Sequence, residues 1–171
     1  VAVAYDGLLQ SLSGPAREHL IADQQRWTRS NQSLCVDAIR RFATLHADTL
    51  VAACLEERMS ARNGRLLAMP AGADYPFISE QLMLKAGIAA RSTFRLFASY
   101  PRFDRPGIDN KALNEQIERA VRERIDVGPF PTPGDSYAGP WRVEVRHDLR
   151  FPARGVAAIL FSHYAQLDAV P

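Results

Sequence analysis

The chain has 171 residues, a formal net charge of +2 at pH 7 and 47% hydrophobic residues. The near balance of acidic and basic groups argues against nucleic acid or an anionic membrane surface as the partner. No apolar run is long enough to cross a bilayer, and the hydrophobic content suffices for the core of one large domain or two small ones.

Residues 1 to about 70 have the apolar spacing of helices. A short first helix ends at Ser13-Gly14-Pro15, and Pro15 can open the next helix. In this second helix Leu20, Trp27 and Leu34 recur every seven residues. The repeat predicts a buried stripe, with Trp27 in the core rather than in a ligand site.

A third helix follows a turn near Asp48, its expected N-cap. Its inner face is expected to carry residues about four apart, namely Val51, Leu55, Met59, Arg62 and Leu66. A buried Arg62 should pair with an acidic side chain or a helix end inside the fold, with anion binding as the alternative. The short link makes the two longer helices an antiparallel hairpin, with Cys35 and Cys54 near its closed end.

The two cysteines have no Cys-x-x-Cys spacing. An even count favours a bridge in an exported protein, whereas a cytosolic protein would keep two buried free thiols, and the count leaves both open. The chain begins at Val1, which fits either a removed signal peptide or a trimmed chain. Almost all positive charge is arginine, a bias that suggests a GC-rich bacterial genome.

A break at residues 69–74 is the predicted boundary between a helical domain, 1–72, and a second domain, 73–171. Strands are predicted at 77–85, at 94–100 and, with a clear period of two, at 141–150. A run at 156–164 is apolar on both faces and is predicted to be a more central strand. One helix, 110–125, lies between them with Asp109 as N-cap. This order predicts an α+β fold whose mostly antiparallel sheet packs against one helix.

The N-terminal part resembles the LprI-type lysozyme-inhibitor family. The matching residues fall within about residues 4 to 67, and they are Gln24, Trp27, Cys35, Cys54, Arg62 and Leu66. Tyr5 and the leucines after it fit that family's opening helix. The chain departs from the pattern at Asn31, where the family usually has Arg, and at Met59, where Thr is common.

The C-terminal part is similar to the extracellular domain of RsiV-type anti-sigma factors, which also accompanies PdaC-type peptidoglycan deacetylases. The likeness lies in a strand that ends with Tyr100-Pro101-Arg102-Phe103, followed by a helix that carries Asn114 and Ile117. The paired strands 141–150 and 154–164 fit the later portion of that domain. Its Gly-Gly-Ala-His segment is replaced here by Ala165-Gln166-Leu167-Asp168, so the domain is divergent or incomplete in this chain.

Both resemblances imply an exported protein, periplasmic or secreted, and the first also implies a Cys35–Cys54 disulfide. Both families include members that bind lysozyme or work at peptidoglycan, so the expected partner is a peptidoglycan hydrolase. The expected role is that of an inhibitor or immunity protein. The alternative is a module that senses lysozyme or binds the glycan itself, and this functional inference is analogy rather than site chemistry.

The titratable residues predict neither an enzyme nor a metal or cofactor site. His147 and His163 are two histidines on strand faces, whereas zinc needs three or four convergent ligands. The glutamates of the 110–125 helix alternate with arginines, as on an ion-paired surface. No nucleophile, metalloprotease, P-loop or dinucleotide motif is present. An enzyme whose site is completed beyond Pro171 or by a second chain is the remaining alternative.

The candidate partner-binding segment is the Pro- and Gly-rich stretch 127–140, stiffened by prolines that reduce the entropy lost on binding. It carries an aromatic and an acidic group for insertion into a hydrolase cleft, and its candidate contact residues are Phe130, Asp135, Ser136 and Tyr137. The alternative is a plain connection between the helix and the next strand.

Overall fold

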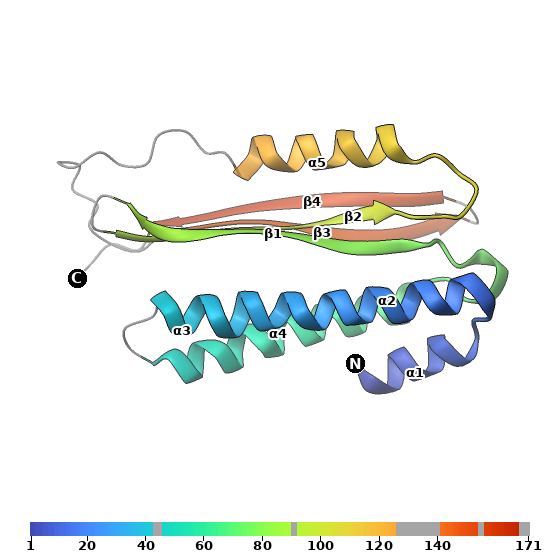
Figure 1. Ribbon diagram of the computed structural model, residues 1–171, viewed down its shortest axis with the longest axis horizontal. Coiled ribbons are helices and arrows are strands. Elements are labelled where there is room, and N and C mark those ends of the chain that lie inside the picture. The colour runs from blue at the N-terminus through green and yellow to red at the C-terminus, as the bar shows by residue number, and fades with distance from the viewer. Residues whose placement is uncertain (43–45, 90–91, 126–140, 154–155, 168–171) are drawn as a thin grey trace.

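The structure is a computed structural model that describes residues 1–42, 46–89, 92–125, 141–153 and 156–167. Helices come first, and a four-stranded sheet with one further helix follows (Figure 1). The elements are α1 (Ala2–Gln10), α2 (Gly14–Asn31), the π-helical turn η1 (Gln32–Asp37), α3 (Ala38–Phe42), α4 (Ala47–Ala68), the 3-10 turn η2 (Gly72–Asp74), β1 (Ile78–Ala89), β2 (Ser92–Phe103), α5 (Lys111–Ile125), β3 (Trp141–Ala153) and β4 (Val156–Leu167).

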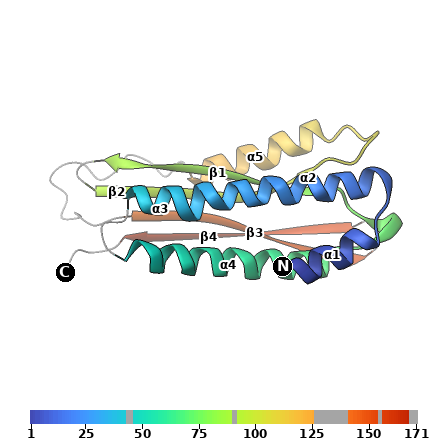
Figure 2. The ribbon, with the colours of Figure 1, turned by 60° about the horizontal axis from the view of Figure 1, so that its bottom comes forward.

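The sheet is the middle layer of three. Helix α5 lies on one face, and α2 and α4 lie side by side on the other face, with α1 beneath them (Figures 1 and 2). In α5, buried Ile117 and Val121 pack against Ala98 of β2 and Val145 of β3. The α+β fold with a packed helix is therefore confirmed.

The sheet is mixed, in the strand order β1-β2-β3-β4. Strands β1 and β2 pair antiparallel, as do β3 and β4, whereas β2 and β3 run parallel. The parallel pair follows from the crossover through α5, because a chain that passes over a helix re-enters the sheet in the same direction. The predicted mostly antiparallel sheet thus contains one parallel pair.

The prediction that residues 156–164 form a more central strand is wrong. Strand β4 is the last strand of the sheet, and no described strand pairs with its outer edge. The prediction failed because an apolar run on both faces normally marks a strand with neighbours on both sides. In this chain such a strand occupies an edge.

The helical part is a hairpin whose first arm is the continuous run α2, η1 and α3. Helix α4 begins at Ala47 after His46, whose φ of 55° lies in the left-handed region. Asp48 is therefore not the N-cap that the sequence predicts. It lies in the first turn of α4 and pairs with Arg40 at 3.4 Å. Within the described residues, no helix is both long and apolar enough to cross a membrane.

The predicted inner face of α4 is wrong at one position. Met59 is exposed, and Arg58 is buried in its place. Successive steps of four residues drift around a helix that has about 3.6 residues per turn, so an uninterrupted series of four leaves the buried face. The inner face returns to the predicted stripe at Arg62 and Leu66.

Parallel pairing of β2 with β3 ends at Ala98↔Val145, and Pro101 accounts for this. Glu80, the partner of Pro101 in register, donates its N–H to Asp23 Oδ1 at 3.0 Å and not to β2. Two residues opposite each other in an antiparallel pair either both bond to each other or both direct their backbone N–H and C=O groups away from each other, and Glu80 and Pro101 are a pair of the second kind. The nitrogen of Pro101 therefore faces β3 without a hydrogen to donate.

Candidate functional site

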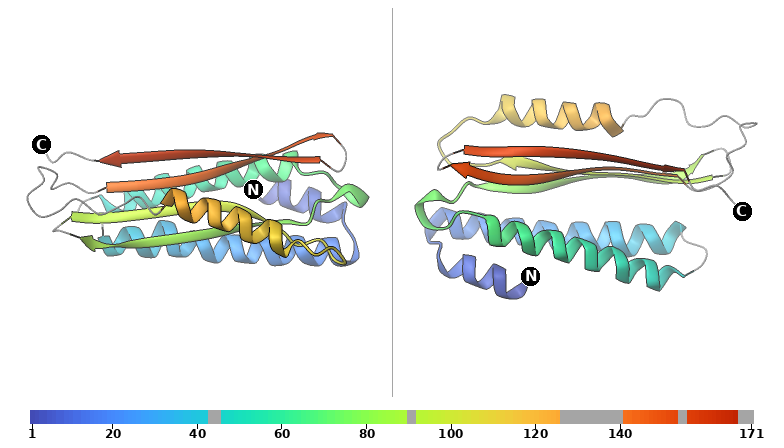
Figure 3. Two further views of the ribbon diagram at one scale, coloured as in Figure 1. Left: turned by 90° about the horizontal axis from the view of Figure 1, so that it is seen from above. Right: turned by 180° about the vertical axis from the view of Figure 1, so that it is seen from behind.

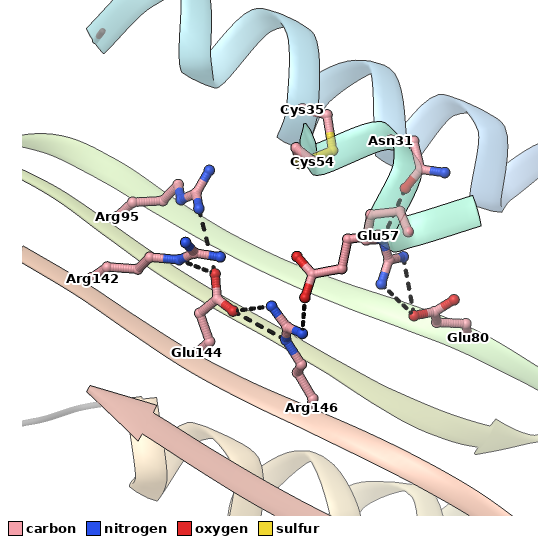
Figure 4. Close-up of a disulfide and its surroundings, with 10 residues drawn as sticks. Asn31, Cys35, Cys54, Glu57, Glu80, Arg95, Arg142, Glu144 and Arg146 are labelled. Atoms are coloured by element: carbon pink, nitrogen blue, oxygen red, sulfur yellow. Dashed lines mark hydrogen bonds and ion pairs between the residues drawn. A yellow bond between two sulfur atoms is a disulfide. The ribbon is translucent and has the colours of Figure 1, made fainter. Parts of the chain in front are cut away.

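Cys35 of η1 and Cys54 of α4 form a disulfide that joins the two arms of the helical hairpin (Figure 4). Their Cα atoms lie 5.5 Å apart. The bridge packs against Leu34 and against Phe97 of β2, so it is buried between the helices and the sheet. The disulfide implied by the first resemblance is confirmed.

Arg62 of α4 is almost fully buried and forms an ion pair with Asp23 of α2, Nη1 to Oδ2, at 2.7 Å. Its Nε donates to Gln24 Oε1 at 3.1 Å, and its guanidinium lies 5.8 Å from the centre of the Trp27 ring. Trp27 itself is buried, as predicted. Arg62 thus pairs inside the fold, as predicted, and its partner is Asp23.

Glu80 of β1 receives two further arginines of α4. Arg58 donates to Glu80 Oε1 at 3.1 Å, and Arg65 pairs with Oε2 at 2.9 Å. Burial alone would raise the pKa of Glu80, but the charges of Arg65 and Arg58 outweigh it and lower that pKa to about 2. Asn31, which departs from the family pattern, accepts a 2.9 Å bond from Arg58 Nε. These contacts form an ionic layer between helices and sheet.

The first resemblance, and part of the second, rest on residues that are buried or partly buried. Of the residues that match the first family, none is exposed, and Arg62 contacts both Gln24 and Trp27. In the second set, Tyr100 and Ile117 are buried in the core between the sheet and α5. These positions build the scaffold, and a partner has to be recognised by other residues.

Sequence reasoning missed a polar cluster at the other end of α2. His19 Nδ1 shares a 2.9 Å hydrogen bond with the hydroxyl of Tyr75, and His19 Nε2 lies 3.5 Å from Asp104 Oδ2. Burial, and then the charge of Asp23, raises the pKa of the Tyr75 phenol, which keeps it protonated. Tyr75 is only 1% exposed, so the cluster ties α2 to the segment before β1. No sequence spacing connects these distant residues.

His147 of β3 is also buried, and Ser99 Oγ shares a 3.1 Å hydrogen bond with its Nδ1. Burial first, then the charge of Arg65, lowers the pKa of His147 to about 4. His163 of β4 is exposed and does not converge with it. Among the described residues, no group of three or more metal-binding side chains comes together.

The polar face of β3 is covered at one place, where Glu144 is only 3% exposed. Arginines surround this carboxylate (Figure 4), which bonds to Arg142 and Arg146 and lies 3.4 Å from Arg95 Nη2. Burial would raise the pKa of Glu144, but hydrogen bonds and charges from Arg142 and Arg146 lower it. We call these residues, with Glu57 of α4, the arginine cluster.

The arginine cluster can bind an anionic group. Its arginines outnumber its carboxylates, and Arg142 and Arg146 remain partly exposed. Arg146 also bonds to Glu57, so the cluster is fixed between the helical layer and the sheet. The nitrogens of Arg146 already bond to Glu144 and Glu57, and Arg142 Nε bonds to Glu144, so an incoming carboxylate or phosphate would meet the guanidinium hydrogens that these bonds leave over.

The predicted contact residues Phe130, Asp135, Ser136 and Tyr137 lie outside the described residues. The segment that carries them joins the end of α5, Ile125, to the start of β3. Arg142 is the second residue of β3, so the arginine cluster lies beside the point where this segment rejoins the sheet. Helix α5 was predicted to carry its carboxylates on an ion-paired surface, and Glu118 does pair with Arg122 there.

A cavity of about 500 Å³ opens at the opposite end, where β2 and β3 have separated. Its walls are mainly apolar and include Ile78, Phe103 and Phe151, with Arg105 and Asp74 at its margin. Arg105 donates to the backbone oxygen of Tyr75 at 2.9 Å, so its guanidinium is already engaged in the fold.

Comparison of the chain with protein-family models, with curated proteins and with solved structures found no match in any of the three.

Proposed function

We propose that this chain is an exported cell-envelope protein that binds and inhibits a peptidoglycan-cleaving enzyme, as a lysozyme-type inhibitor or an immunity protein. The observation that supports the proposal most is that residues of the first resemblance meet inside the helical hairpin. Arg62 contacts both Gln24 and Trp27, and Cys35 is bonded to Cys54. Contacts among these residues are what a shared family pattern would lead us to expect, and in this sense they support the proposal.

The disulfide supports the proposed compartment. Disulfides persist in oxidising environments such as the periplasm and the cell exterior, and they are rare in the cytosol. The Cys35–Cys54 bond joins two helices at their closed end and packs against Phe97 of the sheet. It therefore stiffens a scaffold of the kind that an inhibitor needs, because a rigid surface loses little entropy on binding.

The proposed contact surface combines the segment 127–140 with the arginine cluster. Glycan-cleaving enzymes hold two carboxylates in an open cleft. Partly exposed Arg142 and Arg146 can pair with such carboxylates, while Phe130 and Tyr137 supply aromatic anchors. Inhibition would be steric, because the segment would fill the cleft and exclude the substrate.

A lytic-activity assay tests this proposal. The purified chain is added at micromolar concentration to a panel of secreted muramidases and amidases acting on cell walls. Inhibition of at least one enzyme is expected, and the double variant Phe130→Ala with Tyr137→Ala should weaken it at least about tenfold. The control Glu115→Ala, exposed on α5, should inhibit like the wild type. Failure to bind or inhibit any member of the panel would overturn the proposal.

Sedimentation with purified wall sacculi separates the alternative from the main proposal. A chain that pellets with sacculi and leaves every hydrolase active would be a glycan-binding or sensing module. A chain that stays in the supernatant and inhibits a hydrolase would support the inhibitor role.

A further inference from the structure

The outer edge of β4 is the least protected surface among the described elements. Its twelve residues, Val156 to Leu167, contain no Asp, Glu, Lys or Arg. Natural edge strands are usually blunted by charge, proline, a bulge or a covering element. In Figure 3, α5 crosses the β1–β2 side of the sheet and β4 forms the opposite edge. Strand β4 thus has the composition of a buried strand in the position of an edge strand.

The side chains of β4 show which face is open. Val156, Leu160 and Tyr164 are 50%, 59% and 53% exposed, and they lie on the face of the helical hairpin, because Tyr164 is opposite Glu144 in register. On the other face, Ile159 and Phe161 pack against the core under α5. The strand is therefore held by the core on one side and presents an alternating apolar row on the other.

The other edge of the sheet, β1, is protected. The backbone N–H of Glu80, which points away from β2, is taken by the carboxylate of Asp23 on α2. Strand β1 also carries an exposed charged residue, Lys85. Both are recognised ways of preventing a further strand from pairing at an edge. Of the two edges of the sheet, only the β4 edge is therefore open to pairing with a further strand.

We propose that a second copy of this chain pairs with β4, strand against antiparallel strand, to form one continuous sheet with four strands from each copy. With the two-fold axis at Leu160, Val156 lies opposite Tyr164 of the second copy. Ala158 then lies opposite Ser162, and Ile159 opposite Phe161. Each side chain keeps its face of the sheet, because an axis perpendicular to the sheet relates even-numbered positions to even-numbered ones.

Charge and packing both favour a second copy as the occupant. A strand paired with itself brings like residues together, and any charge near the axis would meet its own copy. Strand β4 has no such charge, so self-pairing brings no repulsion. The pairs Val156–Tyr164 and Ile159–Phe161 join aliphatic to aromatic side chains, which are favourable neighbours across strands. An interface of one strand pair is small, so the expected dissociation constant is roughly micromolar.

Sedimentation equilibrium with the whole chain tests the proposal from about 1 to about 200 µM, a range that brackets such an affinity. The wild type should pass from monomer to dimer. Leu160→Lys should remain a monomer throughout, because it places two ammonium groups opposite each other at the axis. The control Leu67→Lys, which changes a 70% exposed residue of α4, should dimerise like the wild type. A wild type that stays monomeric, or a dimer that Leu160→Lys leaves intact, would overturn the proposal.

A cysteine variant provides a test that does not depend on loss of association. Leu160→Cys should form a disulfide-linked dimer on mild oxidation, because residues opposite one another across paired strands have Cβ atoms about 4.5–5.5 Å apart. Leu67→Cys should not form this dimer. Equal cross-linking of the two variants, or none in Leu160→Cys, would contradict pairing at β4. The assay is independent of hydrolase inhibition, so the two proposals can fail separately.

Discussion

The side-chain amide of Asn114 bonds to both backbone groups of Phe103. Asn114 Oδ1 accepts from the Phe103 N–H, and Asn114 Nδ2 donates to the Phe103 C=O, each at 2.9 Å. These groups face the side on which β3 has already separated from β2, so α5 supplies the pairing that a neighbouring strand would otherwise provide. The Asn-x-x-Ile spacing of the second resemblance thus has a structural reason, since Asn114 completes the strand and Ile117 enters the core.

Replacing Asn114 by Ala should destabilise the fold by about 2 kcal/mol, because two partly buried backbone groups of Phe103 would lose their partners. The measurement is urea unfolding followed by circular dichroism. Asn110→Ala is the matched control, since the side chain of Asn110 makes one hydrogen bond within the described residues, an exposed one of 3.5 Å to the Ile108 oxygen. Equal loss of stability in the two variants would contradict the role assigned to Asn114.

Breaking the buried ion pair should be more damaging. Arg62→Met leaves the buried carboxylate of Asp23 without its cation and should cost about 3–5 kcal/mol. The double variant Arg62→Met with Asp23→Leu should recover part of this loss, because no isolated charge then remains. Arg122→Met removes one partner of an exposed pair on α5 and should leave the unfolding midpoint unchanged. A loss for Arg62→Met no larger than that for Arg122→Met would contradict the buried ionic layer.

Acid should destabilise the fold in a window that His147 defines. Its pKa is about 4 in the folded chain, against an ordinary 6.5, so only the unfolded chain takes up this proton between those values. The free energy of unfolding should therefore fall by about 3 kcal/mol as the pH drops from 6.5 to 4. Below 4.5 the depressed pKa of Glu80 adds a further loss.

Burial also lowers the pKa of His19, so the variant His147→Phe should remove the part of the slope between pH 6.5 and 4.5 that His147 contributes and leave the part from His19 and the more acidic fall in place. His163→Gln, which changes an exposed residue of β4, is the control and should keep the wild-type profile. A His147→Phe profile as steep as the wild type would show that another group titrates in this window.

Removing the disulfide should cost about 3 kcal/mol, as expected for a bridge that closes a loop of about twenty residues in the unfolded chain. The variant Cys35→Ser with Cys54→Ser should unfold at correspondingly lower urea. Adding a reducing agent to the wild type should reproduce the effect and leave the double variant unchanged. A thiol reagent that labels both cysteines in the unfolded, unreduced chain would contradict the bond.

The elements could be predicted because each depends on local periodicity. The alternation of Val143 and Val145 marks a strand, and the stripe through Ile117 and Val121 marks a helix. The order of the strands depends on long-range packing, which periodicity does not encode. For this reason periodicity predicts an interior position for β4, which is an edge strand, and does not predict the parallel pairing of β2 with β3.

The polar interior was harder to predict. Arg62 and Cys35 could be assigned inward roles from their positions on helical stripes and from the resemblance. The acidic partners of the buried arginines could not be assigned from the sequence. Asp23, the partner of Arg62, lies on another helix, and Glu80, the partner of Arg58, lies on a strand. A buried Glu80 resembles any surface glutamate in sequence until the tertiary fold brings arginines to it.

The ionic layer also has a mechanical consequence. Apolar contacts are non-directional, whereas charge-assisted hydrogen bonds join defined donors and acceptors and weaken when the distance or angle between them departs from the preferred geometry. Asp23 and Glu80 each form an ion pair with an arginine of α4, and these pairs therefore fix the position of the helices on the sheet. The helical layer and the sheet should therefore move together as one rigid body, with little displacement of one layer relative to the other.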